Sequence, residues 1–149
     1  MSLKAQIQAD LKLAMKSADK ARVRILRMIT AAIKQREVDE RIELDEPQTL
    51  AVLEKMLKQR KDAAKQYKSA KRDDLAAVEE KEIAVITDFM PKALAQDEVI
   101  KLIKSAIADT NAISIKDMGK VMGVIKPKVQ GRVDMGELSS KVRDLLTKE

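Results

Sequence analysis

Hydrophobic residues near the start of the chain recur at the spacing of an amphipathic α-helix. Between residues 3 and 16 the apolar positions form one stripe, namely Leu3, Ile7, Leu11 and Met15. This stripe predicts a first helix that buries all four side chains. Asp19 is the expected N-cap of a second helix, because its carboxylate can accept a hydrogen bond from a free backbone N–H. The apolar pattern of that helix continues to about Val38.

Two further helices are predicted before a boundary marked by proline. The periodicity fails in the acidic segment of residues 39–46 and returns after Pro47, and acidic residues followed by proline are typical of a helix start. Asp73 or Asp74 is the expected cap of the fourth helix. Pro91 ends that helix, because proline disfavours helical backbone at the residue before it.

Three shorter helical patterns follow Pro91. The first covers residues 99–107, and the second begins near Ser114 and is expected to stop at Pro127. The third begins at Asp134, with Glu137 three residues later in the spacing of a capping box.

The second of these helices carries two pairs of residues at four-residue spacing. Met118 and Met122 are predicted to face the core. Gly119 and Gly123 are predicted to let another helix pack closely.

No alternating pattern of strand length occurs, so the sequence predicts an all-α fold. An N-terminal helical domain of about four helices is expected over residues 1–91. A small three-helix tail domain is expected over residues 92–149.

Charge adds a candidate partner to this picture. The chain has 30 Lys and Arg against 24 Asp and Glu, a net charge of +6, which weakly favours a polyanion such as RNA. One row of cations runs along the third helix at spacings of three and four, namely Lys58, Lys61, Lys65, Lys68 and Arg72. The row is either a solvated face whose lysines cover the edge of the core or a stripe that faces phosphates.

The absent residue types exclude much of enzyme chemistry. The sequence has no Cys and no His, so it offers no thiol nucleophile, no imidazole base and no familiar zinc site. Ser139, Ser140 and Lys141 superficially resemble an amidase set, but neighbouring residues on one helix point in different directions. The acidic segment of residues 39–46 lacks the glycine turn and closing Glu of a calcium loop. No catalytic residue, metal or cofactor is therefore predicted.

The sequence also indicates where the protein is located and which class of nucleic acid it is unsuited to bind. Residues 1–16 mix charged with apolar positions, and no apolar run approaches the about 20 residues of a membrane span, so a cytoplasmic protein without membrane contact is expected. One Tyr, one Phe and no Trp leave no aromatic platform for single-stranded bases.

Several short motifs, in order along the chain, resemble the YqeY family over essentially its whole length. They are Leu11-Lys12-Leu13-Ala14-Met15-Lys16, Asp19-Lys20, Leu26-Arg27-Met28-Ile29, Lys71-Arg72-Asp73-Asp74-Leu75, Glu79 to Ile83, Phe89-Met90-Pro91, Met118-Gly119-Lys120-Val121-Met122-Gly123 and Gly131-Arg132-Val133-Asp134. The resemblance implies a helical N-terminal domain joined to a three-helix tail. From about Lys92 the tail is similar to the C-terminal domain of the B subunit of the tRNA-dependent amidotransferase, and related modules are appended to some glutaminyl-tRNA synthetases.

In those larger proteins the tail engages tRNA and performs no chemistry. The family label, carbon–nitrogen ligase with glutamine as amide donor, would need a nucleophile and a phosphate-binding loop that this sequence lacks. A non-catalytic accessory module that binds tRNA or another structured RNA is therefore expected. The candidate RNA contacts are Lys116, Lys120, Lys126, Lys128, Arg132, Lys141 and Arg143, and the row from Lys58 to Arg72 is a secondary candidate.

Lys126, Lys128 and Arg132 are expected on a loop around Pro127 and Gly131, where backbone could come close to a phosphodiester. The alternative is a helical adaptor that docks an aminoacyl-tRNA synthetase or an amidotransferase without touching RNA.

Overall fold

The computed structural model of the chain describes residues 2–147. Contacts group the chain into two compact units, Met1–Met90 and Pro91–Glu149, called unit 1 and unit 2 below. Every regular element within the described residues is a helix, which confirms the all-α class. None of these helices combines the length and apolar character that a membrane span requires.

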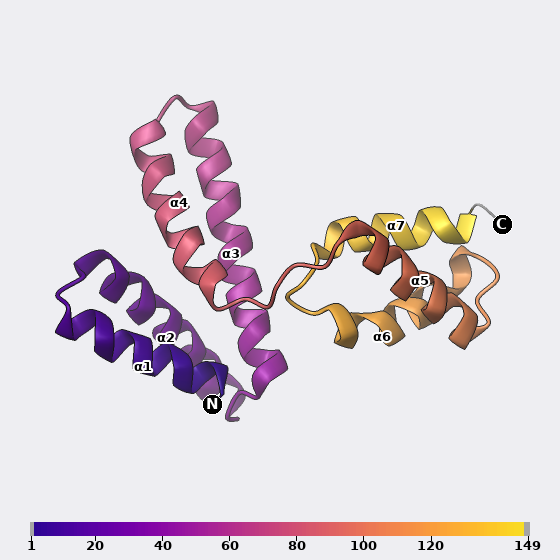
Figure 1. Cartoon of the computed structure of the whole chain (residues 1–149), viewed down its shortest axis with the longest axis horizontal. Helices are drawn as coiled ribbons and strands as arrows, with labels where there is room; N and C mark the ends of the chain where they lie inside the picture. The colour runs from indigo at the N-terminus through magenta and orange to yellow at the C-terminus, as the bar shows by residue number, and fades with distance from the viewer. Residues whose placement is uncertain (1, 148–149) are drawn as a thin grey trace. The chain divides into compact units, whose positions relative to one another are not determined.

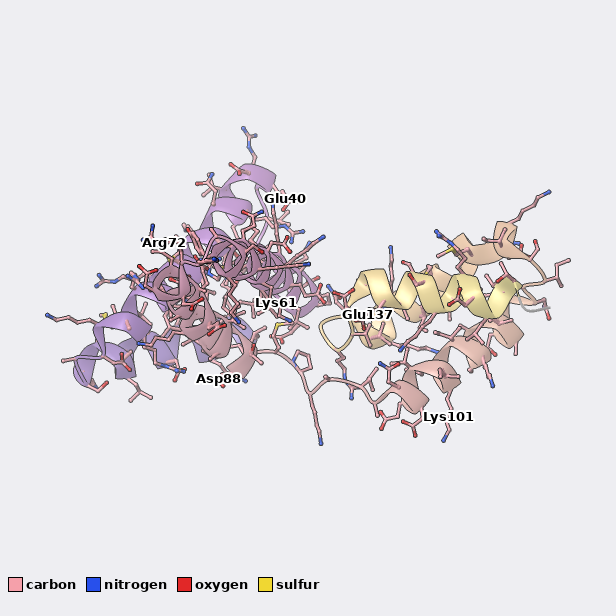
Figure 2. The ribbon with its side chains drawn as sticks, turned by 90° about the horizontal axis from the view of Figure 1, so that it is seen from above. Glu40, Lys61, Arg72, Asp88, Lys101 and Glu137 are labelled. Atoms are coloured by element: carbon pink, nitrogen blue, oxygen red, sulfur yellow. The ribbon has the colours of Figure 1, made fainter. Side chains whose placement is uncertain are left out.

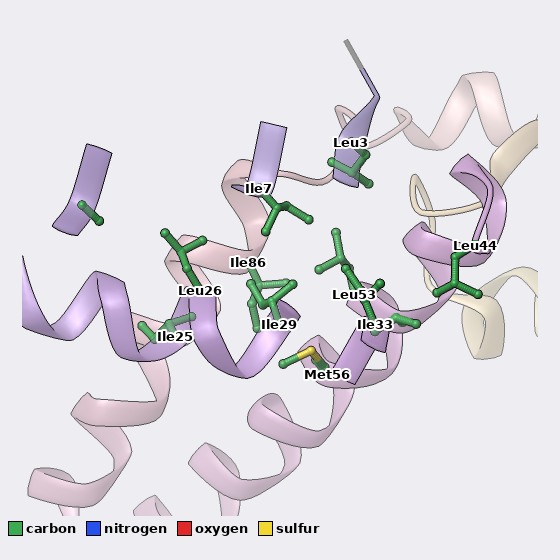
Figure 3. Close-up of a cluster of buried hydrophobic side chains, with 12 residues drawn as sticks. Leu3, Ile7, Ile25, Leu26, Ile29, Ile33, Leu44, Leu53, Met56 and Ile86 are labelled. Carbon is green, nitrogen blue, oxygen red and sulfur yellow. The ribbon is translucent and has the colours of Figure 1, made fainter. Parts of the chain in front are cut away.

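Unit 1 consists of two helical hairpins, as Figure 1 shows. The first hairpin is α1 (Leu3–Lys16) with α2 (Lys20–Glu40), and the second is α3 (Glu46–Ser69) with α4 (Asp73–Asp88). All four helices contribute to one core, including Ile7, Leu26, Ile29, Leu53 and Ile86, each fully buried (Figure 3). Each such side chain contributes about 1.5–3 kcal/mol by its removal from water.

The predicted N-cap of α2 is confirmed, and α3 begins at the predicted acidic start before Pro47. The Asp19 carboxylate accepts a hydrogen bond from the backbone N–H of Arg22 at 3.1 Å. Asp45 and Gln48 form a capping box, in which each side chain accepts from the other residue's backbone N–H, at 2.9 and 3.0 Å. The acidic segment before α3 is anchored to unit 1, because Leu44 is buried in the core.

Two predictions for unit 1 are wrong. Met15 is 48% exposed, and Ala14 takes the buried position. A strict four-residue spacing drifts around a helix of 3.6 residues per turn, so by Met15 the stripe has left the buried face. Neither Asp73 nor Asp74 is an N-cap, since Arg72 holds that position without a side-chain cap. Asp74 instead accepts two hydrogen bonds from the Arg72 guanidinium, each 3.2 Å.

Unit 2 contains α5 (Gln96–Thr110), the short 3₁₀ helix η1 (Ile115–Asp117), α6 (Met118–Val129) and α7 (Met135–Thr147). These helices bury a second core that includes Ile103, Val121 and Leu138. Met118 and Met122 pack in this core, as predicted.

The ends of α6 and α7 are fixed by different residues. Asp134 caps α7 through the backbone N–H of Glu137 at 3.0 Å, which confirms the predicted start. The prediction that Pro127 stops α6 is wrong, because the helix continues to Val129. Pro127 lies in the last turn, where its missing N–H removes one helical hydrogen bond and the end of the helix tolerates the loss. Gly131 then turns the chain with a φ of 77°, a conformation that favours glycine.

Candidate nucleic-acid interface

The predicted RNA contacts lie on three helices of unit 2 and in one turn between them. Lys116 is in η1, Lys120, Lys126 and Lys128 are on α6, Arg132 is in the turn after α6, and Lys141 and Arg143 are on α7. The expectation of a loop at Lys126 and Lys128 is therefore wrong, because α6 includes Pro127. Helical backbone holds these two lysines in place.

Two of the seven candidates are used inside unit 2. The Arg132 side chain donates from Nε to the carbonyl oxygen of Lys92 at 2.9 Å, and the Arg132 carbonyl accepts from the N–H of Leu94 at 3.0 Å. Lys141 donates from Nζ to the side-chain oxygen of Gln96. Both cations therefore hold the segment that leads into α5, and their loss would disturb the fold as well as any RNA contact.

The remaining five candidates are exposed: Lys116, Lys120, Lys126, Lys128 and Arg143. None of them forms an ion pair within residues 2–147. Asp117, the nearest acid to Lys120 in sequence, accepts a hydrogen bond from the Ile113 N–H at 3.0 Å. This bond, a second from the Ser114 N–H and the charge of Lys120 lower the pKa of Asp117 below its ordinary value.

The solvent side of α6 is smooth and positively charged. Gly119 and Gly123 are exposed, and a Cβ added to either would have no neighbour within 4 Å. The prediction that they permit close packing within the chain is therefore wrong. Because Lys120 and Pro127 share their side of the helix, we call Gly119, Lys120, Gly123 and Pro127, together with Lys116 just before, the α6 face.

Pro127 adds a hydrogen-bond acceptor to the α6 face. A helical residue normally donates its N–H to the carbonyl four residues earlier, which here belongs to Gly123. Proline has no N–H, so this carbonyl lacks its usual helical donor on an exposed stretch of backbone. The α6 face thus combines cations, bare backbone and a carbonyl that can accept a hydrogen bond.

The secondary row is divided by its contacts, and only its first four members lie on α3. The prediction that Arg72 continues the row on this helix is wrong, because α3 ends at Ser69 and Arg72 is the N-cap of α4. Lys68 pairs with Glu80 of α4 at 2.5 Å, and this hydrogen bond raises the pKa of Lys68 above its ordinary value. Arg72 pairs with Asp74 at 3.2 Å. Lys58, Lys61 and Lys65 are exposed and form no ion pair within residues 2–147. Lys61 and Arg72, one from each group, are labelled in Figure 2.

The most enclosed charges of unit 1 were not predicted. Arg60 of α3 and Glu82 of α4 form an ion pair of 2.8 Å, and their side chains are 10% and 8% exposed. Arg60 follows buried Met56 by four residues, and Glu82 precedes buried Ile86 by four. That helical spacing was the available signal that both charges lie on the buried stripe.

In the described part of the chain, no three acidic residues lie close enough together to bind a metal ion. Ser139 is half-buried and Ser140 exposed on α7, and Lys141 is bonded to Gln96. The contacts of Lys141 thus place it at the start of α5.

Comparison with known proteins assigns the chain to a family. A family model described as Yqey-like protein matches residues 4–146. The chain is similar to proteins named "Altered inheritance of mitochondria protein 41, mitochondrial". The Pyrenophora tritici-repentis protein is 26% identical over 95% of this chain and 79% of its own length. The Vanderwaltozyma polyspora protein is 30% identical over 96% of this chain and 71% of its own length.

The Clavispora lusitaniae relative of the same name is 37% identical over 67% of this chain. That match spans 59% of the relative, less than two thirds of its length.

The names of these relatives overturn the expected cytoplasmic location, because they describe mitochondrial proteins. The expectation depended on the lack of an apolar leader, but mitochondrial targeting segments are amphipathic and basic, so that criterion does not detect them. The match over nearly every described residue shows that the chain belongs to the YqeY family.

Proposed function

We propose that the chain is a non-catalytic accessory module that binds structured RNA through the α6 face of unit 2. The RNA that we propose first is tRNA. The observation that supports this proposal most directly is the pair of exposed glycines beside Lys116 and Lys120. Each glycine inside a helix costs about 1 kcal/mol relative to alanine, and neither packs against the rest of the unit. A ligand that approaches the helix backbone closely would account for both.

The chemistry of the α6 face suits an RNA backbone. Lys116, Lys120 and the flanking Lys126 and Lys128 offer ammonium groups to phosphates. The Gly123 carbonyl can accept a hydrogen bond from a ribose 2′-hydroxyl, which DNA lacks. Such contacts recognise the shape of a folded RNA and leave its base sequence largely unread.

The family label of carbon–nitrogen ligase with glutamine as amide donor reflects the similarity of this chain to amidotransferase tails. We infer that any such activity belongs to a larger assembly that contains an aminoacyl-tRNA synthetase or an amidotransferase. The mitochondrial relatives direct the search for RNA and protein partners to that organelle.

A salt titration of tRNA binding by the full chain tests the proposal. We expect the triple variant Lys116→Ala, Lys120→Ala, Lys128→Ala to bind tRNA more weakly and to lose about 0.9 of slope in log K against log salt for each lost contact. Different tRNAs should be affected alike.

The matched control is Lys58→Ala, Lys61→Ala, Lys65→Ala, which removes the same charge from exposed positions of α3. Affinity and slope that match the wild type in the first variant would refute the proposal. A larger effect of the control would move the RNA site to unit 1.

An adaptor function is favoured by a separate observation, the exposed methionines Met15 and Met28 of unit 1.

A further inference from the structure

A long open groove follows the α1–α2 hairpin of unit 1. It consists of three adjoining hollows with volumes of about 630, 510 and 310 Å³. The first two share Arg27 and Ala31, and the last two share Lys4, Lys34 and Glu37. Since α2 has 21 residues, the groove follows a helix about 31 Å long. We call it the α1–α2 groove.

Large apolar side chains are exposed at both ends of the groove. Met15 and Met28 line one end and are 48% and 40% exposed. Val38 and Ile42 line the other end and are 60% and 40% exposed. None of the four belongs to the core of unit 1. Two pairs of exposed apolar residues, one at each end of the same groove, indicate a contact surface, whereas residues scattered singly would not.

Cations dominate the polar lining of the groove. Lys20, Arg27 and Lys34 form no ion pair within residues 2–147. Arg24 reaches Glu82 only at 3.5 Å, and its side chain stays 60% exposed. The fifth cation, Lys4, is neutralised by Glu37 at 2.7 Å and lies 3.6 Å from Glu43. The free charge of the groove is therefore positive along its middle and at the Met15 end.

The middle of the groove also has a small residue. Ala31 is exposed and is shared by the two larger hollows. Its short side chain lets a partner approach the backbone of α2 there. Methionine side chains at the Met15 end are flexible and can adapt to different apolar shapes.

These features together fit one kind of occupant. We propose that the α1–α2 groove binds an acidic amphipathic helix of a partner protein. Apolar residues of that helix would contact the two ends of the groove, and its Asp or Glu side chains would pair with Arg27 and Lys34. Electrostatic complementarity of this kind selects the partner and speeds its association.

Other occupants satisfy only part of the surface. An RNA backbone would pair with the cations and leave Met15, Met28, Val38 and Ile42 uncovered. A membrane surface favours a continuous apolar face bordered by cations, whereas here cations separate two apolar ends. The groove lies in unit 1 and the α6 face in unit 2, so each proposal can fail without the other.

The test uses the full chain with methionine methyl groups labelled for NMR. The probe is a synthetic helical peptide of about 20 residues, the length of α2, with leucines along one face and glutamates beside them. A second peptide has lysine at every glutamate position. We expect the acidic peptide to shift the methyl signals of Met15 and Met28 and to leave those of Met118 and Met122 unchanged.

Charge reversal in the groove should reverse the preference between the two peptides. In the variant Arg27→Glu, Lys34→Glu we expect affinity for the acidic peptide to fall about tenfold or more and affinity for the basic peptide to rise. The matched control Lys61→Glu, Lys65→Glu changes the same charge at exposed positions of α3 and should bind like the wild type. Ala31→Leu, which narrows the groove without changing charge, should also weaken binding.

Several outcomes would overturn the proposal. They are no binding at millimolar peptide, methyl shifts outside the groove, and equal loss of affinity in the groove variant and the α3 control. If tRNA or vesicles of anionic lipid displace the peptide from the wild type, and their own direct binding is lost in Arg27→Glu, Lys34→Glu, the groove would be assigned to those ligands instead.

Discussion

The Arg60 guanidinium donates from Nε to Glu82 at 2.8 Å, in a place where both side chains are about nine-tenths enclosed. The pair joins α3 to α4, and Arg24 of α2 adds a longer contact of 3.5 Å to the same carboxylate. Arg60 also donates to the carbonyl oxygen of Met56 at 3.4 Å. One carboxylate thus connects three helices of unit 1.

Loss of one partner of this pair should destabilise unit 1 severely. Arg60→Met leaves the Glu82 charge enclosed with only the distant Arg24, so we expect a loss of about 3–5 kcal/mol in the free energy of unfolding. Urea denaturation followed by tyrosine fluorescence measures this, because Tyr67 of α3 is the single tyrosine and the chain has no tryptophan. The signal therefore reports on unit 1 alone.

The double variant Arg60→Met, Glu82→Leu provides the control. Apolar residues of similar size avoid the cost of an unpaired charge, so the double variant should recover most of the stability lost in Arg60→Met. If the double variant lost as much stability as Arg60→Met and Glu82→Leu lose in sum, the two side chains would not be coupled, contrary to what their distance implies.

Acid should weaken the contact between α1 and α2. The Glu37 carboxylate accepts hydrogen bonds from Lys4 Nζ at 2.7 Å and from the Leu44 N–H at 2.9 Å, and these lower the pKa of Glu37 below its ordinary value of 4.5. Folding therefore favours the ionised form. Its stabilising contribution is complete well above pH 4.5 and disappears as pH falls through the lower pKa of the folded state.

Comparison of the wild type with Glu37→Gln isolates this contribution. At neutral pH the variant should unfold at lower urea concentration, as measured by Tyr67 fluorescence, and the difference should vanish in strong acid. A difference that stays constant with pH would show that the carboxylate charge is not the cause.

Lys71→Gly should stabilise unit 1. Lys71 follows the end of α3 with a φ of 59°, and a left-handed backbone costs a residue with a Cβ about 1–2 kcal/mol. Glycine removes that cost but loses part of the gain through the greater freedom of the unfolded chain, so we expect a net gain of about 0.5–1 kcal/mol. Lys65→Gly, at an exposed position inside α3, should lose about 1 kcal/mol in the same urea assay.

Alanine at Gly119 and Gly123 should separate stability from RNA binding. Both positions have room for a Cβ. Gly123→Ala, inside α6, should stabilise the helix by about 1 kcal/mol, and Gly119→Ala, in its first turn, by less, as measured by far-ultraviolet circular dichroism on heating. On our proposal the added methyl groups obstruct RNA, so tRNA affinity should fall although the protein becomes more stable. Gly136→Ala should gain less, because its Cβ would lie 3.1 Å from the capping oxygen of Asp134. Unchanged tRNA affinity in the doubly substituted chain would remove the α6 face from the proposed site.

Local chemistry explains which parts of the fold were predictable. Asp19, Asp45 and Asp134 bind backbone groups three residues ahead, so the sequence around each shows the helix start. Prediction failed where the effect of a residue depends on its position within the helix. Pro127 lies in the last turn of α6, where a proline is tolerated, and nothing in its immediate neighbours shows this.

The candidate site was less predictable because its contacts join distant parts of the chain. Arg132 and Lys141 have the charge expected of RNA contacts, yet their partners Lys92 and Gln96 lie 40 and 45 residues away in sequence. Arg60 and Glu82 are 22 residues apart, and charged residues are ordinarily assigned to the surface. Only the packed structure shows which cations remain available to a ligand.

The left-handed backbone at helix ends bears on how this protein can evolve. Arg41 and Lys71, like Ala18 and Asn111, have positive φ without being glycine. The first two are not among the residues of either proposed surface, so single substitutions there can raise stability without altering a binding contact. A lineage that gains such a change can then accept a destabilising change in the groove or on α6, and its partners can diversify while the fold persists.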